Sequence, residues 1–194
     1  MKNRVRLVFA NVVREPAFAW AAGELGWQAA GGPREYAQSH EREWLPRGTG
    51  ASVTYVDDKL VEAQYLLVGG TQEEVASVRE SVSALAPFYT KDSIRVMLDP
   101  AAGSYNPILG LYVAALTAPP EAEPEILSWF RDAMAHSNPV LRRAAYFATS
   151  YPGWREFEPM LVKAGEEDPD AEARDLAVKA LASLRKHVWK EGRT

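Results

Sequence analysis

The feature that most constrains the fold is a dipeptide that returns at a fixed interval in the second half of the chain. Asn106-Pro107 is followed 32 residues later by Asn138-Pro139, and a further step of 32 reaches Asp170. Asn and Asp are preferred N-cap residues, and proline is favoured in the first helical turn because its missing amide is not needed there. Each copy therefore predicts a helix start, and repeated helix starts predict stacked helical units.

The helices that follow these starts share one apolar face. In each copy, apolar residues occupy positions i, i+4 and i+7, which lie on one side of an α-helix. They are Leu109, Val113 and Leu116, then Leu141, Ala145 and Ala148, then Ala173, Ala177 and Ala180. The intervening segments 124–134 and 154–167, with a shorter one at 93–98, carry apolar stripes typical of partner helices. The sequence therefore predicts about three helical hairpins, with small residues that let the helices approach closely.

The repeats resemble the HEAT-repeat family over roughly residues 91 to 189. The residues that carry the likeness are Asn138 to Ala145 with Ala148, and Asp168 to Arg174 with Ala177, Ala180 and Leu181. They look like the family's Asp-Pro, Val-Arg, Ala and Ala-Leu pattern in the second helix of each unit. The first copy departs from it, because Gly110 replaces the arginine. The resemblance implies a short HEAT-like α-solenoid, in which Arg142 and Arg174 are structural and pair with an acidic residue of an adjacent loop.

Residues 1–90 have a different pattern, so we divide the chain into an N-terminal α/β segment and helical repeats over 91–194. Two runs rich in β-branched and aromatic residues predict a β-hairpin over 53–68. A capping box follows, with Thr71 as the N-cap and Glu74 three residues later, and it predicts a helix over 71–86. The expected fold class is therefore α+β, mostly α.

The pattern before this hairpin is weaker. Residues 5–13 have helical spacing, which favours an N-terminal helix, although the alternation in 4–7 is also compatible with a strand. Residues 14–50 contain too many Pro and Gly residues for a long regular element. The conformation of residues 1–50 is therefore left open.

Composition excludes several kinds of chemistry. The chain has no cysteine, so disulfides, thiol catalysis, thiolate zinc sites and iron–sulfur clusters are ruled out. Acidic residues outnumber basic ones after residue 50, and the net charge is −4, which disfavours nucleic acid as a partner. The apolar run near the N-terminus is interrupted by Asn11, Arg14 and Glu15, so it lacks the character of a signal peptide or membrane span. We expect a cytoplasmic protein without a membrane partner.

The sequence contains no arrangement of residues typical of a catalytic or metal site. Its three histidines, His40, His136 and His187, lie in separate predicted elements, and the nucleotide-loop and nucleophile-elbow motifs are absent. Asp57-Asp58 lies between two strands and predicts a turn. The acidic run 166–172 is explained by helix capping, with a negative patch for a basic partner as the alternative. We expect neither an enzyme nor a cofactor or metal.

These observations favour a non-enzymatic protein-binding module, either an adaptor or an inhibitor such as a bacterial immunity protein. The partner is another protein, and a basic one is one option because opposite charges speed association. Tyr146, Phe147 and Trp154 are expected to be the most exposed aromatic residues. The full set of candidate partner-binding residues is Tyr112, Arg143, Tyr146, Phe147, Trp154, Asp175 and Lys179.

Two alternatives come from other classes of function. One is a HEAT-like enzyme, a chromophore lyase or a base-excision glycosylase, which requires a pocket with convergent ionisable groups. The other is a structural component of a larger assembly, in which the edge of the hairpin adds to a neighbour's sheet.

Overall fold

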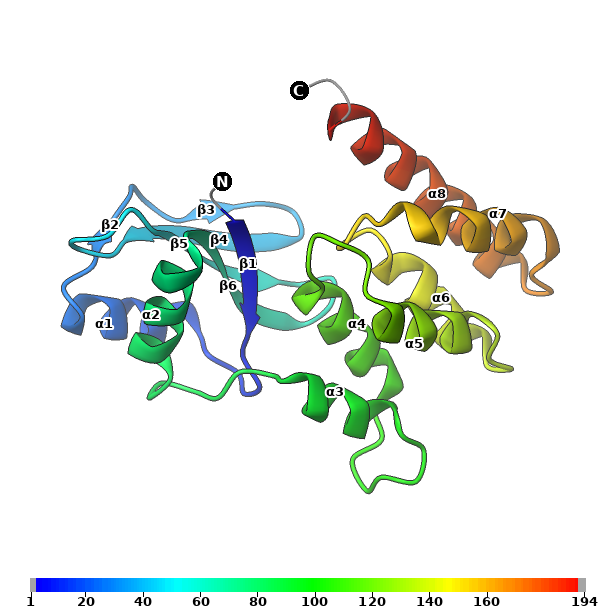
Figure 1. The fold of residues 1–194 in the computed structure, drawn as a ribbon, viewed down its shortest axis with the longest axis horizontal. Coiled ribbons are helices and arrows are strands. Elements are labelled where there is room, and N and C mark those ends of the chain that lie inside the picture. Colours follow the sequence, from blue (N-terminus) through cyan, green and yellow to red (C-terminus); the bar gives the residue numbers. More distant parts are fainter. Residues whose placement is uncertain (1–2, 192–194) are drawn as a thin grey trace. The chain divides into compact units, whose positions relative to one another are not determined.

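The computed structural model describes the backbone of residues 3–191 and the side chains of residues 4–186 (Figure 1). The chain divides into two compact units, residues 1–90 and 91–194. The first contains an antiparallel sheet with two helices, and the second is helical. This composition confirms the predicted α+β, mostly α fold class.

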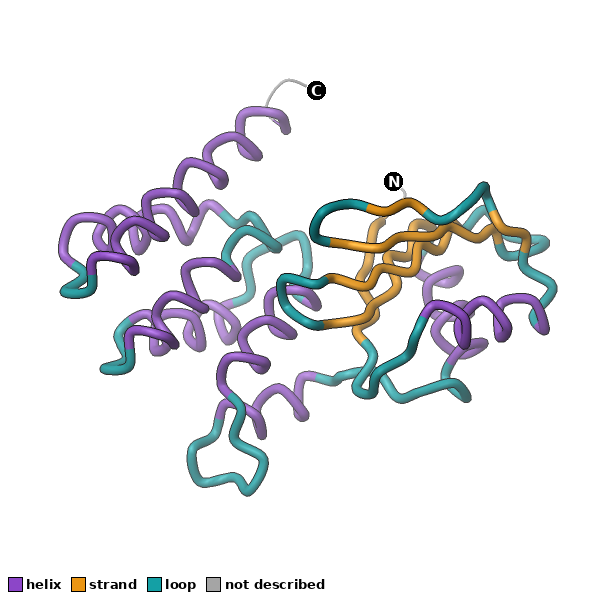
Figure 2. The backbone as a smooth tube through the Cα atoms, turned by 180° about the vertical axis from the view of Figure 1, so that it is seen from behind, coloured by secondary structure: helices purple, strands orange, loops and turns teal. Residues whose placement is uncertain are grey.

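The first unit is built on a six-stranded antiparallel sheet, drawn in orange in Figure 2. The strands are β1 (Asn3–Val8), β2 (Gln28–Ala29), β3 (Arg34–Glu35), β4 (Ser39–Leu45), β5 (Ser52–Asp58) and β6 (Ala63–Gly70). Their order is β1-β6-β5-β4-β2, and β3 also pairs with β4. The unit therefore has a continuous sheet rather than an isolated hairpin.

Strands β5 and β6 form a hairpin in the middle of this sheet. Asp58 stabilises the turn, because one of its carboxylate oxygens accepts a hydrogen bond of 3.0 Å from the Leu60 amide. Both hairpin strands are paired on their other sides too, β5 with β4 and β6 with β1. The hairpin therefore has no free edge, which removes the basis for the expected addition of this edge to a neighbour's sheet.

Two helices, α1 (Glu15–Glu24) and α2 (Gln72–Val82), bury apolar side chains in the sheet unit's core. The capping box begins α2, since Thr71 Oγ1 accepts from the Glu74 amide and Glu74 Oε2 accepts from the Thr71 amide. The residues of this core include Leu7, Phe18, Trp44, Val53, Tyr55, Leu66, Val68, Val78 and Val82. The helix predicted over 71–86 is thus present, and it ends slightly earlier.

The helix expected over residues 5–13 is wrong. Residues 3–8 form β1, which pairs with β6 from Asn3 opposite Gly70 to Val8 opposite Tyr65. The alternation of charged and apolar residues in 4–7 suits a strand, and a distant pairing partner decides between the two spacings. Residues 14–50 are also more regular than expected, because they contain α1 and the seven-residue β4.

The second unit consists of helices that pack in consecutive pairs. Its elements are α3 (Lys91–Leu98), α4 (Pro107–Thr117), α5 (Pro124–Met134), α6 (Pro139–Ala148), the 3₁₀ turn η1 (Arg155–Phe157), α7 (Glu158–Glu167) and α8 (Ala171–Glu191). Within each pair α3 contacts α4, α5 contacts α6 and α7 contacts α8. The second helices also contact one another, α4 with α6 and α6 with α8. This gives a stack of three helical pairs; its membership of the HEAT family stays a prediction.

The repeated helix starts are N-caps. The side chains of Asn106, Asn138 and Asp170 each accept a hydrogen bond from an amide of the following first turn. The small residues of the predicted stripe lie inside the stack, where Ala145 and Ala177 are fully buried. Local capping and small apolar residues thus define where each second helix begins and which side faces its neighbours.

Candidate functional site

Six of the seven predicted partner-binding residues lie on the second helices of the helical unit, and all of these except Tyr146 are half-buried or exposed. Tyr112 of α4 and Phe147 of α6 are half-buried, with ring centroids 6.0 Å apart in an edge-to-face arrangement. Arg143 lies one turn before Phe147, and Asp175 and Lys179 are exposed on α8. With Glu172, which pairs with Arg143, these residues make up what we call the second-helix face.

The charges of the second-helix face are paired across and along its helices. Arg143 forms an ion pair with Glu172, which links α6 to α8. Asp175 and Lys179 form an i,i+4 pair with a distance of 2.6 Å between Oδ2 and Nζ. Exposed pairs of this kind contribute little to stability, so a partner could replace them with its own contacts at low cost.

The expectation that Tyr146 is exposed is wrong. Its side chain is 2% exposed, and its hydroxyl donates a hydrogen bond of 2.7 Å to Asp168 Oδ2. Tyr146 lies one turn after Arg142, so both side chains project toward the loop that contains Asp168. Its neighbour Phe147 instead lies on the second-helix face. Tyr146 is therefore a structural residue and is not part of the candidate partner-binding surface.

Trp154 is also buried, contrary to the sequence-based expectation. Its side chain is 3% exposed and stacks on Phe157 with 5.6 Å between ring centroids. The indole Nε1 donates a hydrogen bond of 2.9 Å to the Pro119 carbonyl. The Pro152-Gly153 turn, with Gly153 at φ +67°, directs the following chain inward rather than toward solvent.

The predicted structural arginine, Arg142, anchors a buried network. Its Nε and Nη2 atoms donate hydrogen bonds of 2.8 Å to the two carboxylate oxygens of Asp168. Its Nη1 donates to the carbonyls of His136 and Ser137, so one guanidinium joins the loop before α6 to the loop before α8. Arg174 differs from the expectation, because it donates to the main-chain carbonyl of Asp168 and not to an acidic side chain.

The ionisable groups of this network shift one another's protonation equilibria. The hydrogen bonds from Arg142 hold the pKa of Asp168 well below its usual range, and those from Tyr146 and the Asp170 amide act in the same direction. Burial, together with the hydrogen bond to ionised Asp168, raises the pKa of Tyr146. Each group is thus stabilised in the protonation state that suits its partner.

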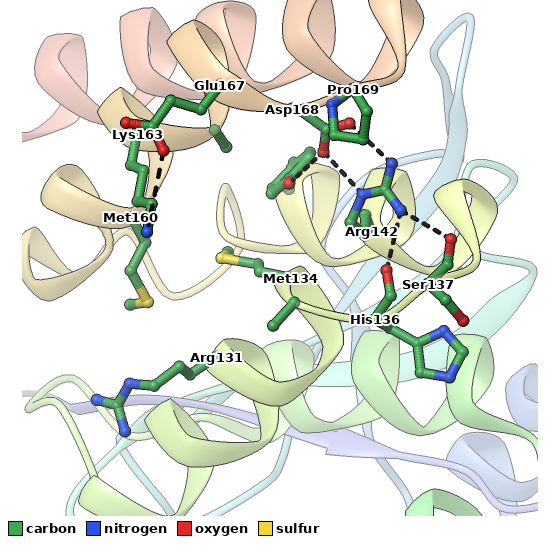
Figure 3. Close-up of a pocket in the computed structure, with 13 residues that line it drawn as sticks. Arg131, Met134, His136, Ser137, Arg142, Met160, Lys163, Glu167, Asp168 and Pro169 are labelled. Carbon is green, nitrogen blue, oxygen red and sulfur yellow. Dashed lines mark hydrogen bonds and ion pairs between the residues drawn. The ribbon is translucent and has the colours of Figure 1, made fainter.

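A cavity of about 520 Å³ adjoins this network within the helical unit (Figure 3). Its lining comes from α5, α6 and α7 and from the loops that follow α5 and α7. Met134 and Met160 supply apolar surface, and Arg131, Lys163 and Glu167 supply charge. The sequence did not predict this cavity. Both methionines lie in apolar stripes that predict core positions, and the distance between two helices cannot be inferred from the residues of either helix alone.

The other groups considered from the sequence have local structural contacts. His136 Nδ1 accepts a hydrogen bond from the Asn138 amide, and His40 Nδ1 lies 2.5 Å from Glu35 Oε1. Asp57 accepts from Gln64 Nε2 at 2.7 Å across the hairpin. Among the residues that the structure describes, no three His, Cys, Asp or Glu side chains are grouped so that they could hold a metal. The side chain of His187 lies outside the described residues.

None of the helices, over residues 3–191, combines the length and the apolar composition that crossing a bilayer requires.

Comparison of the chain with protein-family models, curated proteins and solved structures finds no match. The candidate sites therefore depend on their own geometry: an exposed surface on the second helices, and a cavity beside the Arg142–Asp168 network.

Proposed function

We propose that the chain is a non-enzymatic protein-binding module whose helical unit contacts its partner through the second-helix face. The observation that carries this proposal is the packing of Tyr112 against Phe147 beside the half-exposed Arg143 and the exposed residues Asp175 and Lys179. Aromatic residues that keep part of their surface exposed, next to arginine, are the residues from which protein interfaces draw most of their binding energy.

The stack of helices suits this role because it presents several side chains from different helices on one side. The caps and the buried network fix α6 and α8 internally, so the outward residues are held in place before a partner arrives. A surface that is ordered in advance loses less conformational entropy on binding. The proposed face thus combines aromatic anchors with a rigid support.

The charge pattern supports recognition of a specific partner. The second-helix face alternates cations and anions, namely Arg143 with Glu172 and Lys179 with Asp175. Complementary charges on a partner would fix its orientation and exclude poorly matched proteins. Both an adaptor and an inhibitor would use such a surface. A bacterial immunity protein that binds a basic toxin is one kind of inhibitor, and the net charge of −4 is the observation that favours it.

The experiment that tests this proposal has two stages. Affinity capture with the full chain first identifies a partner, which is then purified and titrated against the chain by calorimetry. The test variant combines Phe147→Ala with Lys179→Glu, and the control variant is Arg155→Glu, which reverses one exposed charge in η1. We expect the test variant to weaken binding at least about tenfold and the control to leave it within about twofold.

Circular dichroism of each variant verifies that the helices remain folded before binding is compared. Equal affinity of the test variant and the unmodified chain would contradict the assignment of the second-helix face. Arg155→Glu weakening the complex as much as the test variant would place the interface elsewhere on the helical unit.

A further inference from the structure

The cavity between α5 and α7 is independent of the second-helix face and has the dimensions of a ligand site. Its volume is about 520 Å³. Small-molecule sites in proteins typically enclose about 300–1,000 Å³. All its lining residues belong to the helical unit, between Arg131 and Pro169.

Methionine side chains provide the apolar part of the cavity. Met134 extends from α5 and Met160 from α7 into the space between these helices (Figure 3). Ala135 and Ala164 add small apolar surface beside them. Methionine is unbranched and polarisable, so a wall made from it adapts to apolar bodies of different shapes. The cavity is therefore suited to a flexible or flat apolar group.

The charged part of the lining carries an excess of one positive charge. Its cations are Arg131, Lys163 and Arg142, and its anions are Glu167 and Asp168. Arg142 and Asp168 neutralise each other in their bidentate pair. Lys163 and Glu167 are 4.0 Å apart and largely exposed, so their interaction is weak. Arg131 forms no ion pair with any residue whose side chain the structure describes.

The position of these charges orients a ligand. Figure 3 shows Arg131, Met160 and the Lys163–Glu167 pair toward one side of the cavity, and the Arg142–Asp168 pair toward the other. An anionic head group is therefore favoured near Arg131 and Lys163, with the apolar body against the two methionines.

We propose that this cavity binds a small amphiphilic anion, consisting of a carboxylate on an apolar body. Arg131 and Lys163 contact the carboxylate, and Met134 and Met160 contact the body. This proposal does not depend on the protein-binding role, because its residues are not those of the second-helix face.

The test uses the full chain with ¹³C-labelled methionine methyl groups, titrated with decanoate and separately with decanol. The chain has four methionines, and Met97 of α3 is an internal control because it is buried away from the lining residues. We expect saturable shifts of the Met134 and Met160 resonances and none of Met97. Decanoate should bind about threefold to fivefold more tightly than decanol, since exposed charge contacts contribute about that much.

Three variants separate the two parts of the site. Arg131→Gln should lower the affinity for decanoate toward that for decanol, with Lys163 keeping part of the difference, and should leave the affinity for decanol unchanged. Met160→Gln should weaken the binding of both. Arg155→Gln is the matched control and should change neither. The proposal is overturned if no saturable shift of Met134 and Met160 occurs at millimolar decanoate, or if decanol binds as tightly as decanoate. Loss of both ligands in Arg131→Gln would likewise remove its assigned role at the carboxylate.

Discussion

Two adjacent arginines on α6 separate the buried side of the helical stack from its exposed side. Arg142 is 7% exposed and bonds both carboxylate oxygens of Asp168, whereas Arg143 is half-exposed and pairs with Glu172 on the surface of α8. Both are pairs of an α6 arginine with a carboxylate, one in the loop after α7 and the other in the first turn of α8. Burial and the additional bonds of Arg142 to main-chain carbonyls distinguish them, and they make the inner pair structural while leaving the outer pair available to a partner.

This comparison teaches how a regular helix can serve two purposes. Residues on its inner side are bonded completely, so that removing one leaves a buried charge without a partner. Residues on its outer side exchange their contacts with water or with another protein at little cost. The predictions below test that contrast, from the largest expected effect to the smallest.

The largest effect is expected for Asp168→Ala. This change leaves the Arg142 guanidinium and the Tyr146 hydroxyl without their shared acceptor. Breaking a buried pair by removing one partner typically costs about 3–5 kcal/mol of unfolding free energy. Urea denaturation followed by circular dichroism at equilibrium measures the loss. A loss below about 1 kcal/mol would be that of an exposed pair, and it would contradict the claim that the Arg142 pair contributes more to stability than the Arg143 pair.

Tyr146→Phe should have an intermediate effect. The substitution keeps the buried ring and removes only the hydroxyl that donates to Asp168. A hydrogen bond to a charged group contributes about 1.5–3 kcal/mol, and the remaining bonds of Arg142 moderate the loss. The same denaturation experiment applies, with Tyr105→Phe as a control at an exposed position of the same helical unit. Equal effects of the two variants would show that the hydroxyl of Tyr146 has no special contribution.

The pH dependence of stability should reveal Asp168 at acid pH. Because Arg142 lowers the pKa of Asp168 in the folded chain, the unfolded chain takes up this proton first, near the ordinary value of about 3.9. The contribution of Asp168 is therefore complete above that value and is lost as the pH falls toward the folded pKa. Unfolding free energies of the unmodified chain should drop more steeply than those of Asp168→Asn between about pH 5 and pH 2. If the unfolding free energies of the two proteins fall equally over this pH range, the lowered pKa of Asp168 is contradicted.

The smallest effect is expected for Glu172→Gln. This change removes the exposed partner of Arg143 and leaves no buried charge behind. The unfolding free energy should change by less than about 0.5 kcal/mol, since surface pairs rarely contribute more. High salt should reduce the difference further by screening. A salt-independent loss of more than about 2 kcal/mol would show that the second-helix face is also part of the structural framework.

Features set by neighbouring residues could be predicted from the sequence. The N-caps at Asn106 and Asn138 and the capping box of Thr71 and Glu74 depend on contacts within one helical turn. The structural pairing of Arg142 with an acidic loop residue was also anticipated, through the resemblance to HEAT repeats. Apolar periodicity then located most helices of the second half, because each stripe repeats within its own segment.

Features set by distant residues could not be predicted in this way. The strand β1 depends on β6, which is about 60 residues away along the chain, and its own spacing also fits a helix. From the sequence, Tyr146 and Trp154 are candidate interface aromatics. In the structure the Tyr146 hydroxyl donates to Asp168 and the Trp154 indole donates to the Pro119 carbonyl, so both are buried. The cavity depends on how far α5 lies from α7, which no single segment encodes.

The most direct test of the central claim is a paired measurement on Arg142→Gln and Arg143→Gln, in which unfolding free energy and affinity for the captured partner are determined for each. The account predicts opposite outcomes: Arg142→Gln lowers stability by several kcal/mol and leaves the affinity of the folded chain within about twofold, whereas Arg143→Gln preserves stability and weakens binding by about fivefold or more. If both variants lose stability alike, or if Arg143→Gln binds the partner as tightly as the unmodified chain, the proposed division between the two sides of α6 is contradicted.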